Sequence, residues 1–179
     1  MARETPYKNL EKSMERSEVP TRAASAEVGA FALRLFRELH GLILAQEAGA
    51  RAGEVEAVHD MRVGIRRLRV ALSNFRVCLS REDRQRLKAR LEHLANALGG
   101  VRDLDVMIEA LTAALPLRAA AERPAIERFI ERLTARRRGR LRTLVKYLQG
   151  PEYAALRAEF GAANLPTPGE EAQSHGQAA

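Results

Sequence analysis

Residues 58–69, VHDMRVGIRRLR, hold one histidine and four arginines within twelve positions. Arginine carries a planar guanidinium group that binds phosphate oxygens through paired hydrogen bonds and keeps its charge at physiological pH. A histidine beside a phosphate adds a further hydrogen-bond donor. These residue types therefore indicate an anion-binding site, and phosphate is the chemical group that they fit best.

The spacing of these residues predicts a basic stripe along one side of a helix. At about 100° per residue, an apolar face is formed by Met61, Ile65, Leu68, Leu72 and Phe75. The basic side chains that flank this face span about 25 Å, and they are His59, Arg62, Arg66, Arg69 and Arg76. Arg67 falls apart from the stripe, on another side of the same helix.

The stripe contains like-charged neighbours such as Arg62 and Arg66, with no acid interleaved. Such pairs cost a few tenths of a kcal/mol each when they stand four residues apart, so solvated faces usually mix charges of both signs. Two interpretations stay open at this point. The stripe is either a binding surface for a polyanion, or a face that is solvated or paired with acids on neighbouring helices.

The net charge of +7 is concentrated in one part of the chain. Residues 59–90 hold ten Arg and Lys residues against three acids, whereas the remainder holds 20 basic and 20 acidic residues. This concentration favours a polyanionic partner over a general contribution to solubility.

Other kinds of chemistry find little support in the sequence. No His, Cys or carboxylate stands three or four residues after His59, and the other histidines are interpreted as scattered surface or boundary residues, so we expect neither a metal nor a cofactor. No phosphate-binding loop, nucleophile elbow or HExxH motif occurs, so we expect no enzyme activity. Asp103 and Asp105, in VRDLDV, either complement the dipole of a helix's first turn or orient the basic stripe.

The composition predicts an all-α fold, because Ala, Leu, Arg and Glu dominate and alternating β-branched runs are missing. Short connections between amphipathic segments predict an antiparallel helical bundle of about five or six helices. Start, stop and periodicity signals place these helices at residues 21–50, 54–79, 81–98, 102–115, 124–149 and 152–162. The third helix is expected to stop at Gly99 and Gly100.

The domain is expected to span residues 21–162, between a flexible N-terminal arm over 1–20 and a disordered C-terminal tail over 163–179. The chain shows no apolar signal segment and no apolar run of about 18 residues, so no membrane association is expected. Cys78 is the one cysteine, which fits a reducing compartment, and we expect a cytoplasmic protein.

A second basic cluster occupies residues 134–148, TARRRGRLRTLVKYL, which contain six basic residues and no acid. Arg128, Arg132, Arg142 and Lys146 fall on the far face of this helix and are expected to be solvated. Arg137 falls near its apolar line, so either the helix is locally shifted or Arg137 reaches a polar cavity.

HDMRVGIRRLR, followed by Phe75 and then by LGGVRDLDV, resembles the CHAD family, the conserved histidine α-helical domain. The later YLQGPEYAALRAEF is similar to the same family more weakly, and the resemblance covers roughly residues 22–162. It implies two pseudo-symmetric helical halves around a basic cavity that binds inorganic polyphosphate, in some members at polyphosphate granules. A triphosphate-hydrolysing domain, which is fused to some relatives, has no counterpart here.

Carried over to this chain, the resemblance implies anion-binding roles for His59, Arg62, Arg66, Arg67 and Arg69. It implies a supporting role for Asp103, with Arg102 beside it. This sequence departs from the family pattern because it holds no second His- and Arg-bearing helix, so we expect it to correspond to one half of the domain. It is either a natural half-domain that dimerises or a fragment with weak binding, and we expect a homodimer whose two stripes line one groove.

The leading expectation is therefore non-catalytic binding of inorganic polyphosphate, or a related phosphate polymer, through the stripe. The alternative is a basic helical protein that binds nucleic acid, which the charge also permits. Aromatic residues for stacking on single strands make up only 4% of the chain, and no helix-turn-helix pattern is present, so this alternative is the weaker one.

Overall fold

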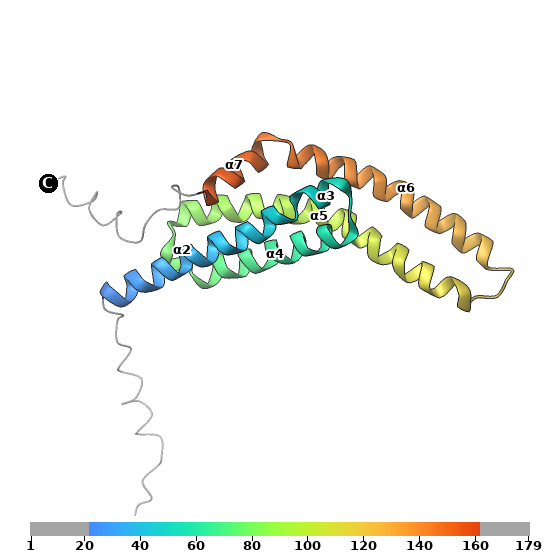
Figure 1. The fold of residues 1–179 in the computed structure, drawn as a ribbon, viewed down its shortest axis with the longest axis horizontal. Helices are drawn as coiled ribbons and strands as arrows, with labels where there is room; N and C mark the ends of the chain where they lie inside the picture. Colours follow the sequence, from blue (N-terminus) through green and yellow to red (C-terminus); the bar gives the residue numbers. More distant parts are fainter. Residues whose placement is uncertain (1–21, 162–179) are drawn as a thin grey trace, which may run out of the picture.

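The computed structural model describes residues 22–161, and all regular structure in this part of the chain is helical (Figure 1). The expected all-α class is confirmed. The N-terminal arm and the C-terminal tail that the sequence predicts lie outside the described residues. The α-helices are α2 (Arg22–Ala45), α3 (Glu47–Ala52), α4 (Val55–Asn74), α5 (Arg81–Ala114), α6 (Arg123–Leu148) and α7 (Pro151–Phe160), with short 3-10 helices at Arg76–Cys78 and Leu115–Leu117.

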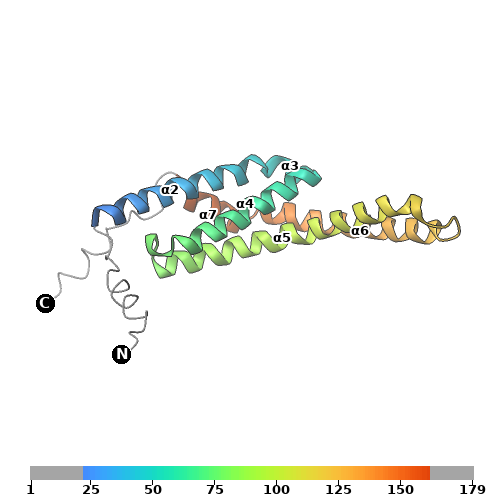
Figure 2. The same cartoon turned by 90° about the horizontal axis from the view of Figure 1, so that it is seen from below.

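The helices form a bundle in which successive long helices are neighbours. α2 packs on α4, α4 on α5 and α5 on α6, while α7 returns along α5 and α6 (Figures 1 and 2). The apolar face predicted for the stripe helix belongs to α4 and lies in the core, where Met61, Ile65 and Leu68 are fully buried. Burying one such side chain contributes about 1.5–3 kcal/mol, so this face fixes how α4 is rotated in the bundle. No helix in residues 22–161 is long and apolar enough to span a membrane.

α5 is one continuous helix of 34 residues, which corrects the expected break at Gly99 and Gly100. Neither glycine adopts a positive φ, so the backbone does not make the left-handed turn that ends helices. Leu98 and Val101 on either side of the pair are fully buried. Their burial outweighs the roughly 1 kcal/mol that each glycine costs in a helix interior.

The helix ends also differ from the expected ones. α2 ends at Ala45, five residues early, because a turn at Gln46 separates it from α3. α4 ends at Asn74 and is followed by the short helix Arg76–Cys78, where a helix to residue 79 was expected.

The corner between α3 and α4 depends on Gly53, whose φ of 82° lies in the left-handed region. The backbone conformation therefore favours glycine, and a Cβ atom at this position would stand 2.5 Å from Cδ2 of Leu141 on α6, so the Leu141 side chain would have to move. The carbonyl oxygen of Gly53 accepts a hydrogen bond of 2.8 Å from Nη2 of Arg137. The corner is therefore fastened to α6 by packing and by a charged donor.

α7 is held against α2 and α3 by a hydrogen bond and by ring stacking. The hydroxyl of Tyr153 donates to Oε2 of Glu47 at 2.9 Å, and Glu47 also pairs with Arg51 at 2.7 Å. His40 stacks on Phe160 with ring centroids 5.0 Å apart. His40 is buried, which corrects the expectation of a surface or boundary residue; burial, assisted by the charge of Arg157, lowers its pKa below the usual value.

The far parts of α5 and α6 extend beyond α2 and α4 as a two-helix hairpin (Figures 1 and 2). Leu104 and Leu133 are buried here, whereas Met107 and Phe129 are exposed. The hairpin therefore has a thin apolar seam rather than a core of its own.

Candidate functional site

Two adjoining hollows run along the seam between α4 and α5, with volumes of about 800 Å³ and about 330 Å³. Arg66 and Arg69 line both hollows, so the two form one elongated depression, which we call the basic groove. Its lining extends along α4 from Arg62 to Asn74, about 18 Å of helix, and continues to Arg76 in the following 3-10 helix.

One wall is formed by Arg62, Arg66 and Arg69 on α4 and by Arg76 on the 3-10 helix that follows, at the positions that the sequence predicts. They share this wall because they flank the face that anchors α4 in the core. Two other predicted site residues do not line the groove. His59 is half-buried one turn before Arg62, and Arg67 is exposed on another side of α4.

The wall on α5 contains two cations that the sequence analysis missed, Arg84 and Lys88. Nη1 of Arg84 donates to the backbone carbonyl of Arg76 at 3.2 Å, which ties the two walls together. In the sequence, Arg84 and Lys88 stand four residues apart within the basic part of the chain. That spacing puts them on one face of α5, but only the packing of α4 against α5 shows that this face meets the stripe.

The groove is almost free of negative charge. Asp103 is the one acid among the described residues that line it, and its Oδ1 lies 3.1 Å from Nη1 of Arg62. Within residues 22–161, no carboxylate pairs with Arg66, Arg69 or Arg76. Among the described residues, ion pairing with acids on neighbouring helices therefore explains Arg62 but not the other arginines of the stripe.

Neutral hydrogen-bonding groups accompany the charges. Ser73, Asn74 and Gln85 line the larger hollow, and Asn96 lines the smaller one. Hydroxyl and amide groups of this kind donate to anion oxygens beside a guanidinium. In the described part of the chain, no group of three His, Cys, Asp or Glu side chains could hold a metal ion.

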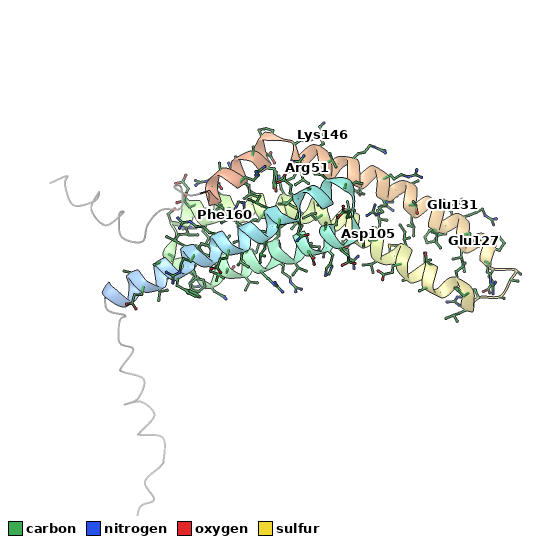
Figure 3. All side chains as sticks on the ribbon, in the orientation of Figure 1. Arg51, Asp105, Glu127, Glu131, Lys146 and Phe160 are labelled. Carbon is green, nitrogen blue, oxygen red and sulfur yellow. The ribbon has the colours of Figure 1, made fainter. Side chains whose placement is uncertain are left out.

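Asp103 and Asp105 point to different partners, and neither stands in a helix's first turn, because α5 begins at Arg81. Asp105 is buried where α5 leaves the bundle (Figure 3) and pairs with Nε of Arg137. α6 is unbroken at Arg137, so the structure favours an internal polar contact over a shifted helix. Arg102 is half-buried outside the groove, and no described residue hydrogen-bonds its buried Nη1.

The family model of the CHAD domain matches residues 34–179 of the chain, and the match includes every residue that lines the groove. The resemblance carried by HDMRVGIRRLR and LGGVRDLDV is thereby confirmed. No curated protein matches the chain.

Proposed function

The chain belongs to the CHAD domain family, which is linked in general to polyphosphate binding, and on this premise we propose that it binds inorganic polyphosphate in the basic groove. The observation that carries the proposal is the composition of the groove. The described lining residues include a single acid, and six cations from α4, the 3-10 helix after it and α5 converge on the groove: Arg62, Arg66, Arg69, Arg76, Arg84 and Lys88.

The shape of the groove supports an extended anion rather than a single phosphate. Arg66 and Arg69 lie between the two hollows, so a ligand that contacts them can continue in both directions. A polymer with a charge on every unit can use all six cations together, whereas an isolated phosphate reaches two or three of them. Related phosphate polymers share this chemistry.

The types of the lining residues support binding without catalysis. They are cations, amides, a hydroxyl group, small or apolar residues and the paired Asp103, which hold and neutralise an anion. His59 lies half-buried one helical turn beyond the groove's Arg62, where it can extend the site for a longer chain.

The test compares two charge reversals in the full chain. Arg66 lies at the centre of the groove, and Arg128 is an exposed arginine on the hairpin outside it. We expect Arg66→Glu to lower the affinity for polyphosphate about 10- to 150-fold, since a charge-assisted contact contributes about 1.5–3 kcal/mol. We expect Arg128→Glu to change it by less than about threefold.

Isothermal titration calorimetry measures the affinities, and circular dichroism checks that both variants keep their helical content. Equal losses from the two reversals would mean that polyphosphate responds to the overall charge of the protein. That result would contradict the assignment of the groove.

A further inference from the structure

The second half of α6 carries exposed positive charge that the basic groove does not use. Five of its basic side chains are exposed: Arg136, Arg138, Arg140, Arg142 and Lys146. We call this set the α6 ridge. No acid occurs between Thr134 and Leu148, whereas in the first half of α6 Glu127 and Glu131 directly precede arginines. The same helix thus changes from a face of mixed sign to one of a single sign.

Contacts inside the protein do not account for the ridge. Arg137, the sixth basic residue of this segment, pairs with Asp105 and Gly53 and lies largely buried. Within residues 22–161, no carboxylate pairs with any of the five ridge residues. Neighbours four apart, such as Arg138 and Arg142, repel each other, so the arrangement costs stability unless a ligand compensates it.

The ridge is convex. At about 100° per residue, its side chains radiate over about 200° of the helix circumference and over about 15 Å of its length. The opposite side carries Leu144 and Leu148, which are buried in the bundle. α6 runs along the outer edge of the molecule, and Lys146 lies on its outer side (Figures 1 and 3). A ligand reaches all five charges only if it surrounds half of the helix.

The major groove of a B-form DNA duplex has the matching shape. It is about 12 Å wide, it accepts an α-helix of about 10–12 Å, and its rims are lined with phosphates on both sides. A flat anionic membrane would meet one line of charges only, and Leu144 and Leu148 point inward rather than toward a lipid surface. Single strands require aromatic side chains for stacking, and the ridge contains none.

From this geometry we propose that the α6 ridge binds double-stranded DNA through its phosphates, without sequence preference. The major groove of duplex RNA is too deep and narrow for side chains to enter, so the ridge selects DNA over RNA of the same sequence.

α4 and α6 pack on different sides of α5 (Figures 1 and 2), and none of the five ridge residues lines either hollow. Arg140 comes nearest to the basic groove, since a Cβ at Gly100 would contact Arg140 and Gly100 lines the smaller hollow. DNA on the other four ridge residues therefore leaves the groove open to a second polyanion. This inference goes beyond the proposed function and does not depend on it.

The test uses the full chain and a fluorescent 30-base-pair duplex as probe. Arg138→Gln with Arg142→Gln removes two ridge charges, and Arg128→Gln with Arg132→Gln removes two charges from the mixed half of the same helix. The ridge variant should weaken DNA binding about tenfold or more and flatten the dependence of log affinity on log salt by about two units. The control variant should bind DNA nearly as the unchanged protein does.

Two further measurements separate this inference from the proposed function. Arg66→Glu should keep most of the DNA affinity, and the ridge variant should keep its polyphosphate affinity. Equal DNA losses from the ridge and control variants, duplex RNA bound as tightly as DNA, or loss of DNA binding in Arg66→Glu would each overturn the inference. The last result would place DNA in the basic groove instead.

Discussion

Asp103 is the one acid among the described residues that line the basic groove. Its Oδ1 forms an ion pair with Nη1 of Arg62 at 3.1 Å. The side chain of Asp103 is 71% exposed, so this pair contributes at most about 1 kcal/mol. A polyanion that enters the groove competes with Asp103 for Arg62 and is repelled by it. We therefore expect Asp103 to lower the affinity for a polyanion, in contrast to the supporting role that the family resemblance implies for it.

We expect Asp103→Asn to raise the affinity for polyphosphate about two- to fivefold in calorimetric titrations. Asp60→Asn is the matched control, because Asp60 is exposed on α4, lies outside the groove and loses the same charge. An affinity that falls in Asp103→Asn would show that Asp103 is needed to orient Arg62.

Arg137 and Asp105 form the most deeply buried ion pair in the described part of the chain, with side chains 16% and 2% exposed. Removing one partner leaves a buried charge without compensation, which typically costs about 3–5 kcal/mol. We expect Arg137→Met to lower the free energy of unfolding in urea by about that amount. The double variant Arg137→Met with Asp105→Leu should recover part of the loss. A double variant less stable than either single one would mean that the bond from Arg137 to Gly53 matters more than the ion pair.

Two glycines on different elements should respond in opposite directions to the same substitution. Gly53→Ala places a side chain at φ 82° and 2.5 Å from Leu141, so we expect it to destabilise the protein by at least about 1 kcal/mol. Gly100→Ala adds a methyl group at ordinary contact distance inside α5, so it should stabilise by about 0.5–1 kcal/mol. Thermal unfolding of both variants checks the signs. A higher unfolding temperature in Gly53→Ala, or a lower one in Gly100→Ala, would contradict the roles given to the backbone at these two positions.

The elements that the sequence predicts well are those that depend on local periodicity. The apolar face of α4 and the placement of Arg62, Arg66 and Arg69 beside it follow from positions along one helix, and the structure has both. The continuity of α5 could not be predicted, because Gly99 and Gly100 are helix-ending signals whose effect is overridden by burial of Leu98 and Val101. The roles of Arg84 and Lys88 could not be predicted either, since they depend on which faces of two helices meet.

For the whole molecule, the uneven distribution of charge predicts a strong dependence of polyphosphate binding on salt. The excess charge of +7 lies in residues 59–90, which contain α4 from His59 onward and the start of α5. If several of these cations each neutralise a phosphate, affinity should fall steeply as salt displaces the contacts, as in nucleic-acid binding. Arg66→Gln should flatten the slope of log affinity against log salt by about one unit. An affinity that does not respond to salt would instead indicate a small ligand selected by shape.

The hairpin beyond the bundle divides α5 between two environments. Its first part is enclosed by α4, α6 and α7, whereas its far part has α6 and the short helix Leu115–Leu117 as neighbours, with few buried side chains. Regions with so few apolar contacts open locally at a small fraction of the free energy of global unfolding. The buried pair of Arg137 and Asp105 stands where the two environments meet, so we expect the boundary between two cooperative units there. The tip of the hairpin can fray and reform many times while α4 and the first part of α5, with the groove between them, stay folded.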